Sequence, residues 1–106
     1  EIGKIPFARE ESVLKFGYKA KNTTTIEAWV SEDSASKVVD KGYRAIATSW
    51  NRYYLNCGHG WWLSNFEGSS WCDPYKGWQK IYSYNPIANI TDPAKQKLVL
   101  GGKVAL

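Results

Sequence analysis

Residues 24–50 read TTIEAWVSEDSASKVVDKGYRAIATSW, and this stretch decides the fold class of the chain. Its first seven residues, 24–30, are mostly β-branched or aromatic, and residues 45–50 are again mostly apolar, so both segments predict strands. Between them the apolar residues recur at a spacing of three and four, which is typical of an amphipathic helix. The stretch therefore predicts a strand, a helix and a second strand.

Both ends of this helix have sequence signals. Ser31 is expected to cap its N-terminus, and Gly42 is expected to stop it. Ala35, Val38 and Val39 form the apolar face that is predicted to pack on a sheet.

Two more strands and one more helix are predicted outside this stretch. Residues 5–8 and 98–106 are apolar runs that predict strands. Residues 73–85 begin with Asp-Pro and predict a second helix, with Trp78 and Tyr82 packed in the core. Most of the strand segments are near-continuous apolar runs, as in parallel strands that are covered on both faces. The alternation of strands and helices predicts an α/β protein.

The composition fits one globular domain, residues 1–106, and excludes several functions. The net charge is +4, but the basic residues are scattered, so no nucleic-acid partner is expected. No apolar run approaches the ~20 residues of a membrane span, so no membrane association is expected. Two cysteines and one histidine, His59, are too few for a metal site, and no cofactor is expected.

The cysteines and two sequons bear on the cellular compartment. Cys57 and Cys72 enclose a stretch rich in Gly and Trp, and a disulfide is predicted to close it, with two free thiols as the alternative. Asn22 (NTT) and Asn89 (NIT) are N-glycosylation sequons in polar connecting segments. These features together favour the secretory pathway, so we expect a secreted, vacuolar or lysosomal protein.

Aromatic residues follow two of the predicted strands at their carboxyl ends, where parallel α/β sheets bind ligands. Trp29 stands at the end of the second strand, and Tyr54 comes just after the third. Aromatic rings beside hydrogen-bonding groups are typical of carbohydrate sites, because the apolar face of a pyranose lies on a ring. Trp29 and Tyr54 therefore predict a sugar-binding site.

The strand and helix alternation stops within a strand at Leu106. Three or four parallel strands with few helices make a poor independent unit, so we expect a fragment of a larger α/β barrel. The alternative is a small open-sheet domain that is complete in itself.

Several short motifs follow one another in a fixed order along the chain. They are TIEAW (25–29), GYRAI (42–46), YLNCG (54–58), WQKIY (78–82), Pro86 and LGG (100–102). In this order they resemble the β-N-acetylhexosaminidases of glycoside hydrolase family 20, and the fungal members share the Cys-Gly-x-Gly loop and the Cys-Asp-Pro segment. The resemblance runs from about Lys4 to Leu106. It implies a (β/α)8 TIM barrel, of which this chain would supply the C-terminal half, about strands five to eight.

The resemblance also implies substrate-assisted retaining hydrolysis, in which the 2-acetamido oxygen of the substrate attacks the anomeric carbon. Trp29 would wall the acetamido pocket, and the Tyr54 hydroxyl would act as a catalytic group that hydrogen-bonds the acetamido oxygen. Asn56 and Arg9 would bind the substrate at positions where the family usually has an aspartate and a tryptophan. The catalytic Asp-Glu pair is expected upstream of this chain, so residues 10–11 (Glu-Glu) are not assigned to that role.

The sequence therefore predicts a portion of a β-N-acetylhexosaminidase that removes terminal GlcNAc or GalNAc from glycans or chitooligosaccharides. The alternative is a non-catalytic secreted carbohydrate-binding module, which Arg9 and Asn56 favour because they depart from the catalytic pattern. The expected partners are a glycan that contains N-acetylhexosamine, the N-terminal half of the barrel, and a second copy of the complete enzyme in a homodimer. Without the acid, this chain alone is not expected to complete the reaction.

Overall fold

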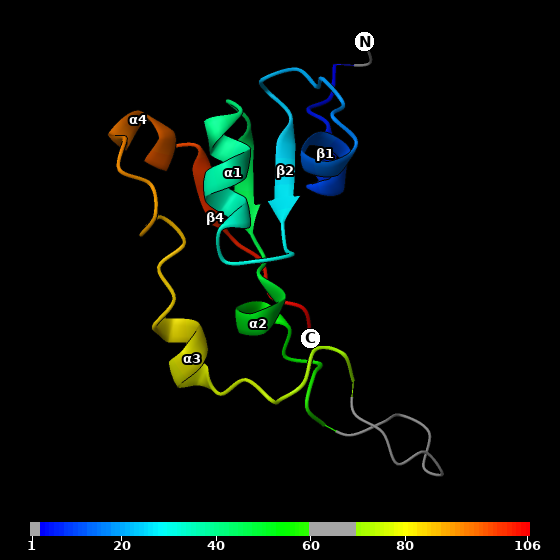
Figure 1. Ribbon diagram of the computed structural model, residues 1–106, viewed down its shortest axis with the longest axis vertical. Coiled ribbons are helices and arrows are strands. Elements are labelled where there is room, and N and C mark those ends of the chain that lie inside the picture. Colours follow the sequence, from blue (N-terminus) through cyan, green and yellow to red (C-terminus); the bar gives the residue numbers. More distant parts are fainter. Residues whose placement is uncertain (1–2, 60–69) are drawn as a thin grey trace.

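The computed structural model describes residues 3–59 and 70–106. It contains a four-stranded sheet whose strands follow sequence order and pair in parallel (Figure 1). The strands are β1 (Phe7–Arg9), β2 (Thr25–Ala28), β3 (Arg44–Ala47) and β4 (Val99–Gly102). The helices are the π-helix η1 (Glu11–Lys15) and the α-helices α1 (Ser34–Asp40), α2 (Trp50–Tyr53), α3 (Trp78–Tyr82) and α4 (Pro93–Gln96).

The order of the strands resembles that of a β/α barrel. In a barrel each parallel strand lies beside the next one in sequence, whereas the order of an open doubly wound sheet reverses at a switch point. Here β1, β2, β3 and β4 lie side by side in that order. The predicted α/β class with a parallel sheet is therefore confirmed.

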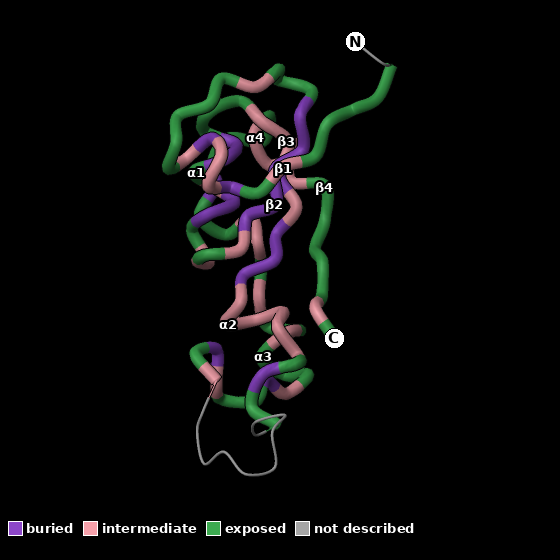
Figure 2. Tube along the Cα trace, turned by 90° about the vertical axis from the view of Figure 1, so that its right-hand side faces the viewer, coloured by how far each residue is buried: buried purple, intermediate pink, exposed green. Residues whose placement is uncertain are grey.

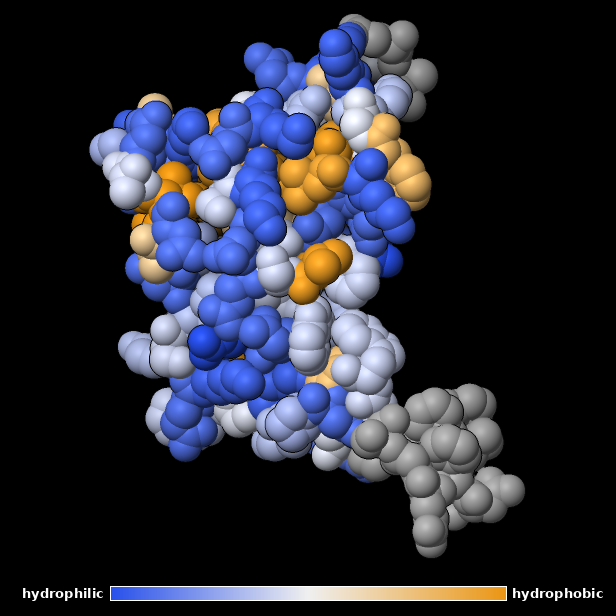
Figure 3. All heavy atoms as spheres, viewed as in Figure 1, coloured by the Kyte–Doolittle hydropathy of each residue, from blue (hydrophilic) through white to orange (hydrophobic). Residues whose placement is uncertain are grey.

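The helices α1, α2 and α3 lie in two different parts of the molecule. Figure 1 shows α1 in front of the sheet, and α2 and α3 beyond the carboxyl ends of the strands. The principal extents of 48 × 31 × 23 Å describe an elongated molecule. On the face drawn in Figure 3, apolar surface lies mainly over the half that contains the sheet, whereas the carboxyl-end half is mostly polar or near neutral.

The core is centred on β2 and α1 (Figure 2). Every residue of β2 is buried, as predicted for a strand that is covered on both faces. In β3 only Ala45 and Ala47 are buried, and most of β4 is exposed, so the prediction is wrong for these two strands. α1 packs on both β2 and β3, and β4 lies at the edge of the described sheet.

The first predicted helix forms, but it begins later than Ser31. The structure starts α1 at Ser34, and the Ser31 backbone N–H donates to Ser34 Oγ at 3.1 Å. Val38 and Val39 are buried as predicted. Gly42 follows the helix with φ +86°, a left-handed conformation that glycine adopts without a steric penalty.

The second predicted helix is largely wrong. Asp73 does not begin a helix, because its carboxylate accepts the backbone N–H groups of Gly58 at 2.6 Å and Ser70 at 2.7 Å. The helix α3 begins only at Trp78. Trp78 and Tyr82 are 69% and 87% exposed, so neither is a core residue of the described structure. Within the described residues, no apolar helix or strand packs against these two side chains.

The structure contains the predicted disulfide between Cys57 and Cys72, and both cysteines are buried. The closed loop brings Gly58 against the backbone of Tyr75. A Cβ added at Gly58 would lie 1.9 Å from the Tyr75 backbone nitrogen, and Gly58 has φ +82°. Only glycine can stand at position 58, because a side chain would overlap the Tyr75 backbone and because the positive φ disfavours other residues.

We expect Gly58→Ala to lower the free energy of unfolding by roughly 2–5 kcal/mol, because it adds backbone overlap to left-handed strain. Gly42→Ala is the matched control, since φ is also positive there but no atom lies within 4 Å of the added Cβ. It should cost only the strain, about 1–2 kcal/mol. Urea unfolding of the full-length chain measures both, and equal losses would contradict the close approach.

Candidate functional site

Four aromatic rings gather beyond the carboxyl ends of β2 and β3. Trp29 and Tyr54 are nearly parallel, with centroids 6.3 Å apart and an interplanar angle of 8°. Trp71 meets the edges of both rings at 6.1 Å, and it lies 5.5 Å from Trp50. The structure thus brings Trp29 and Tyr54 together, and adds Trp50 and Trp71, which the sequence analysis did not assign to the site.

The position of Trp29 is fixed by two consecutive carboxylates at the end of β1. Glu10 is 4% exposed, and its Oε1 accepts the backbone N–H groups of Trp29 and Val30, each at 2.6 Å. Glu11 Oε1 accepts the indole N–H of Trp29 at 2.9 Å. Charge-assisted hydrogen bonds of this kind are short and strong. They fix both the backbone of Trp29 and the direction of its indole ring.

A cluster of charged residues lies beside the rings. The Arg9 guanidinium lies 4.3 Å from the centroid of the Trp29 ring. Arg9 is also 4.0 Å from Glu27, and Lys103 donates to Glu27 Oε1 at 2.7 Å. Glu27 is 7% exposed, and its charge is balanced by these two cations. Glu27 and Lys103 were not predicted, although a carboxylate inside the apolar run of β2 was a usable signal.

Tyr54 follows the short helix α2 and is held through its backbone. It forms an isolated parallel bridge with Ala105, and the Leu55 N–H donates to the Ala105 carbonyl at 2.8 Å. Burial raises the pKa of the Tyr54 phenol above its usual value, while the positive charges of Arg9 and Lys103 act in the opposite direction. The phenol therefore stays protonated at neutral pH and can donate a hydrogen bond.

Asn56 is not part of this arrangement. It is exposed beside the disulfide, and none of the described ring contacts or hydrogen bonds joins it to Trp29 or Tyr54. Of the four residues predicted to bind substrate, the structure therefore gathers Arg9, Trp29 and Tyr54. Among residues 3–59 and 70–106, no three His, Cys, Asp or Glu side chains are grouped as metal ligands would be.

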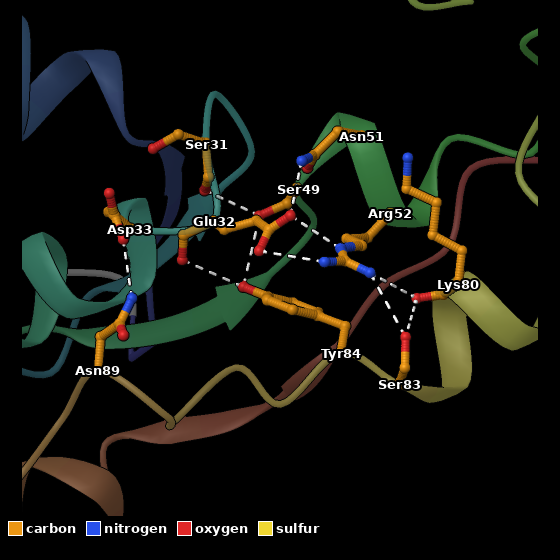
Figure 4. A network of polar contacts seen from close by, with 10 residues as sticks. All are labelled: Ser31, Glu32, Asp33, Ser49, Asn51, Arg52, Lys80, Ser83, Tyr84 and Asn89. Atoms are coloured by element: carbon orange, nitrogen blue, oxygen red, sulfur yellow. Dashed lines mark hydrogen bonds and ion pairs between the residues drawn. The ribbon is translucent and has the colours of Figure 1, made fainter. Parts of the chain in front are cut away.

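A second polar cluster lies between α1, α2 and α3 (Figure 4). Glu32 accepts hydrogen bonds from Arg52 Nε at 2.8 Å and from Asn51 Nδ2 at 2.7 Å. The Tyr84 hydroxyl donates to the Glu32 carbonyl at 3.2 Å. The hydrogen bond from Arg52 is the main reason why the pKa of Glu32 lies below its usual value of 4.5, and the charge of Lys80 lowers it further.

Two hollows in the described surface lie away from the aromatic rings. One of about 660 Å³ is at the amino ends of the strands, lined by residues such as Ile5, Val13 and Ile26. The other, of about 220 Å³, adjoins Glu32 and Arg52. In parallel α/β sheets the ligand side is the carboxyl end, so the aromatic cluster remains the candidate site.

The model of the glycosyl hydrolase family 20 catalytic domain matches residues 2–106. The chain belongs to this family. It is 35% identical over 91 residues to a chitooligosaccharidolytic β-N-acetylglucosaminidase of Ostrinia furnacalis, which covers 84% of this chain and 15% of that protein. It is 32% identical over 101 residues to β-hexosaminidase 1 of Arabidopsis thaliana, which covers 95% of this chain and 16% of that protein.

A solved structure is similar over almost the whole chain. The family 20 exo-β-N-acetylglucosaminidase of Vibrio harveyi, in complex with N-acetylglucosamine, matches with a TM-score of 0.73 and 27% identity, over 98% of this chain and 16% of that one. The chain thus spans about one sixth of that protein. The family is a TIM-barrel family, and this chain forms an α/β segment with a parallel sheet. The match of residues 2–106 to a catalytic-domain model does not favour the alternative of a small open-sheet domain that is complete in itself.

Because the pKa of Glu32 is lowered in the folded protein, the free energy of unfolding should depend on pH through this residue. A carboxylate whose pKa falls on folding stabilises the fold above its usual pKa, and this contribution is lost as the pH drops through the lowered value. We expect Glu32→Gln to remove this part of the acid sensitivity, about 0.2–1 kcal/mol for a partly exposed pair. Urea unfolding of both proteins from pH 7 down to pH 3 measures it, and parallel curves below pH 4.5 would contradict it.

Proposed function

We propose that this chain is the part of a family 20 glycosyl hydrolase that forms one wall of a pocket for terminal N-acetylhexosamine, GlcNAc or GalNAc. The single observation that carries this proposal is the parallel pair of Trp29 and Tyr54, 6.3 Å apart at the carboxyl end of the sheet. Aromatic faces bind the apolar face of a pyranose, and a phenol beside them can hydrogen-bond its substituents. The complete enzyme would hydrolyse glycans or chitooligosaccharides.

Tyr54 would hold the acetamido group of the substrate for reaction. Its hydroxyl would donate a hydrogen bond to the acetamido oxygen and hold this oxygen for its attack on the anomeric carbon. The same hydrogen bond would stabilise the charge that develops on the acetamido group during the attack. Trp29 would form the apolar wall of the same pocket. In support, no residue among 3–59 and 70–106 hydrogen-bonds the Tyr54 hydroxyl, whereas the indole N–H of Trp29 already has Glu11 as its partner.

The catalytic acid would come from residues outside this segment. Glu10 is a poor candidate, because it is buried and its carboxylate holds two backbone N–H groups. Glu11 is occupied by the indole of Trp29. We therefore propose that this chain supplies about strands five to eight of the barrel, and that the preceding half supplies the catalytic Asp-Glu pair.

The alternative of a non-catalytic carbohydrate-binding module is not favoured. The proteins that the chain resembles carry the names of enzymes, β-N-acetylglucosaminidases and β-hexosaminidases. The family model that matches residues 2–106 describes a catalytic domain.

Tyr54→Phe in the full-length enzyme tests the proposed role. The change removes one oxygen and keeps the ring stack with Trp29, so we expect turnover of a chromogenic N-acetyl-β-glucosaminide to fall by roughly 10²–10³. The thermal midpoint should change little. Tyr18→Phe is the matched control, because Tyr18 is 67% exposed at the other end of the molecule. Equal turnover in Tyr54→Phe and Tyr18→Phe would refute the role.

We further propose that the protein passes through the secretory pathway and carries N-glycans at Asn22 and Asn89. Both asparagines are exposed, and the Cys57–Cys72 disulfide suits an oxidising compartment. No helix within residues 3–59 and 70–106 is long and apolar enough to cross a bilayer.

Expression in a eukaryotic secretory host tests the glycosylation sites. Enzymatic removal of N-glycans should lower the mass of the protein, and Asn22→Gln and Asn89→Gln should each remove one glycan. Asn85→Gln, outside any sequon, is the control. Tandem mass spectrometry that finds both sites unmodified would contradict the proposal.

A further inference from the structure

The two rings of the proposed pocket stand on two different segments. Trp29 belongs to residues 29–33, which connect β2 to α1, and Tyr54 directly follows α2. The stacking of the rings therefore depends on how these segments are held relative to each other. A change of about 1 Å in such a position can reduce turnover by up to ~10²-fold.

Apart from the contacts of the Glu32 side chain, the described hydrogen bonds join these segments only at the start of α2. The Trp50 N–H donates to the Trp29 carbonyl at 3.0 Å, and Ser49 Oγ donates to the Ser31 carbonyl at 2.8 Å. Both contacts lie at the start of α2, whereas Tyr54 follows its end. The helix is a single turn, and none of its residues is buried. Such a short helix is marginal by itself. At its far end the backbone bridge of Tyr54 with Ala105 holds the chain against the C-terminal segment, but it does not join α2 to residues 29–33.

Arg52 joins the end of α2 to the segment that carries Trp29. Its Nε donates to Glu32 Oε1 at 2.8 Å, and its Nη1 donates to the Lys80 carbonyl of α3 at 3.0 Å. The guanidinium also lies 5.6 Å from the centroid of the Tyr84 ring. Figure 4 shows Arg52 reaching from α2 to Glu32 on one side and to α3 on the other. One planar side chain thus joins three segments, two residues before Tyr54.

We propose that Glu32 and Arg52 are positioning residues that set the alignment of Tyr54 with Trp29, and through it the affinity and turnover of the sugar pocket. Neither side chain touches the rings of Trp29 or Tyr54 in the described contacts, so the pair acts through the backbone of α2. The part of this inference that concerns sugar rests on the proposed function. The part that concerns ring alignment does not.

Arg52→Ala and Glu32→Gln should therefore each lower kcat/KM for a chromogenic N-acetyl-β-glucosaminide by about 10-fold, within the range for a displaced catalytic group. Arg52→Lys keeps the charge but loses the planar fork, so it should restore only part of the activity. Lys95→Ala is the matched control, because it breaks another ion pair, with Asp40 at 2.6 Å, away from the rings. It should leave kcat/KM unchanged.

A double-mutant cycle separates positioning from general stability. If Arg52 acts through Tyr54, Arg52→Ala should cost about 10-fold in the wild-type background and less than 2-fold in the Tyr54→Phe background. A purely structural effect would be the same in both backgrounds. Equal losses, or activity of Arg52→Ala equal to that of Lys95→Ala, would overturn the proposal. Arg52→Lys and Glu32→Gln serve the same cycle if Arg52→Ala does not fold.

Ring alignment can be measured without a substrate. In protein labelled with 5-fluorotryptophan, the ¹⁹F resonance of Trp29 is assigned by its loss in Trp29→Phe. Arg52→Ala and Glu32→Gln should shift this resonance, and Lys95→Ala should not. An unmoved resonance would overturn the positioning role. An inactive wild-type enzyme that does not bind N-acetylglucosamine would instead refute the proposed function, while the ¹⁹F result would still decide the alignment.

Discussion

A buried carboxylate, that of Glu10, connects the three segments on which the site is built. Glu10 Oε1 accepts the backbone N–H groups of Trp29 and Val30, each at 2.6 Å. The backbone N–H of Glu10 donates to the Glu27 carbonyl at 3.0 Å, and the backbone carbonyl of Glu10 accepts the Leu14 N–H at 2.8 Å. A buried charge is costly unless strong hydrogen bonds compensate it. Here the two N–H groups that follow β2 supply that compensation, while the backbone N–H and carbonyl of Glu10 bond β2 and the π-helix η1, so the three segments are joined at Glu10. These hydrogen bonds set the direction in which the chain leaves β2, and Trp29 directly follows the carboxyl end of that strand.

Beyond that point the molecule changes from apolar packing to polar contacts. Ile26, Val38 and Ala45 form the buried core around β2 and α1, whereas α2 buries none of its residues and is held by hydrogen bonds. In β/α barrels the carboxyl face carries the chemistry and the rest of the barrel supplies stability. The same division explains why we expect a change at Arg52 to affect activity more than unfolding. A partly exposed ion pair contributes little free energy, but it can still decide where a ring lies.

The sequence predicted the elements whose signals are local and missed those that depend on distant partners. Asp-Pro occurs twice, and at Asp92 it begins a helix that was not predicted, with the Asp92 side chain accepting the Ala94 N–H. Asp73 carries the same local signal, but its carboxylate binds Gly58, fifteen residues away in the sequence. The site shows the same limit. Trp29 and Tyr54 were assigned because each comes just after a predicted strand, although α2 separates Tyr54 from β3 in the structure. Glu27 and Lys103 form a pair across 76 residues that no spacing reveals.

Arg9 stands where the family usually has a tryptophan, and the contacts of its guanidinium show how this residue fits beside Trp29. The resemblance places a tryptophan at this position, and replacing it with a flexible cation would be expected to open the wall. Instead, the guanidinium lies 4.3 Å from the Trp29 ring centroid, and Glu11 and Glu27 each lie 4.0 Å from its Nε. A guanidinium is planar and stacks on aromatic faces, which a lysine ammonium does not do. Arg9 therefore places a cation over the ring of Trp29, with the carboxylates of Glu11 and Glu27 nearby. The residue at this position thus brings a positive charge to the Trp29 ring, which a tryptophan would not do.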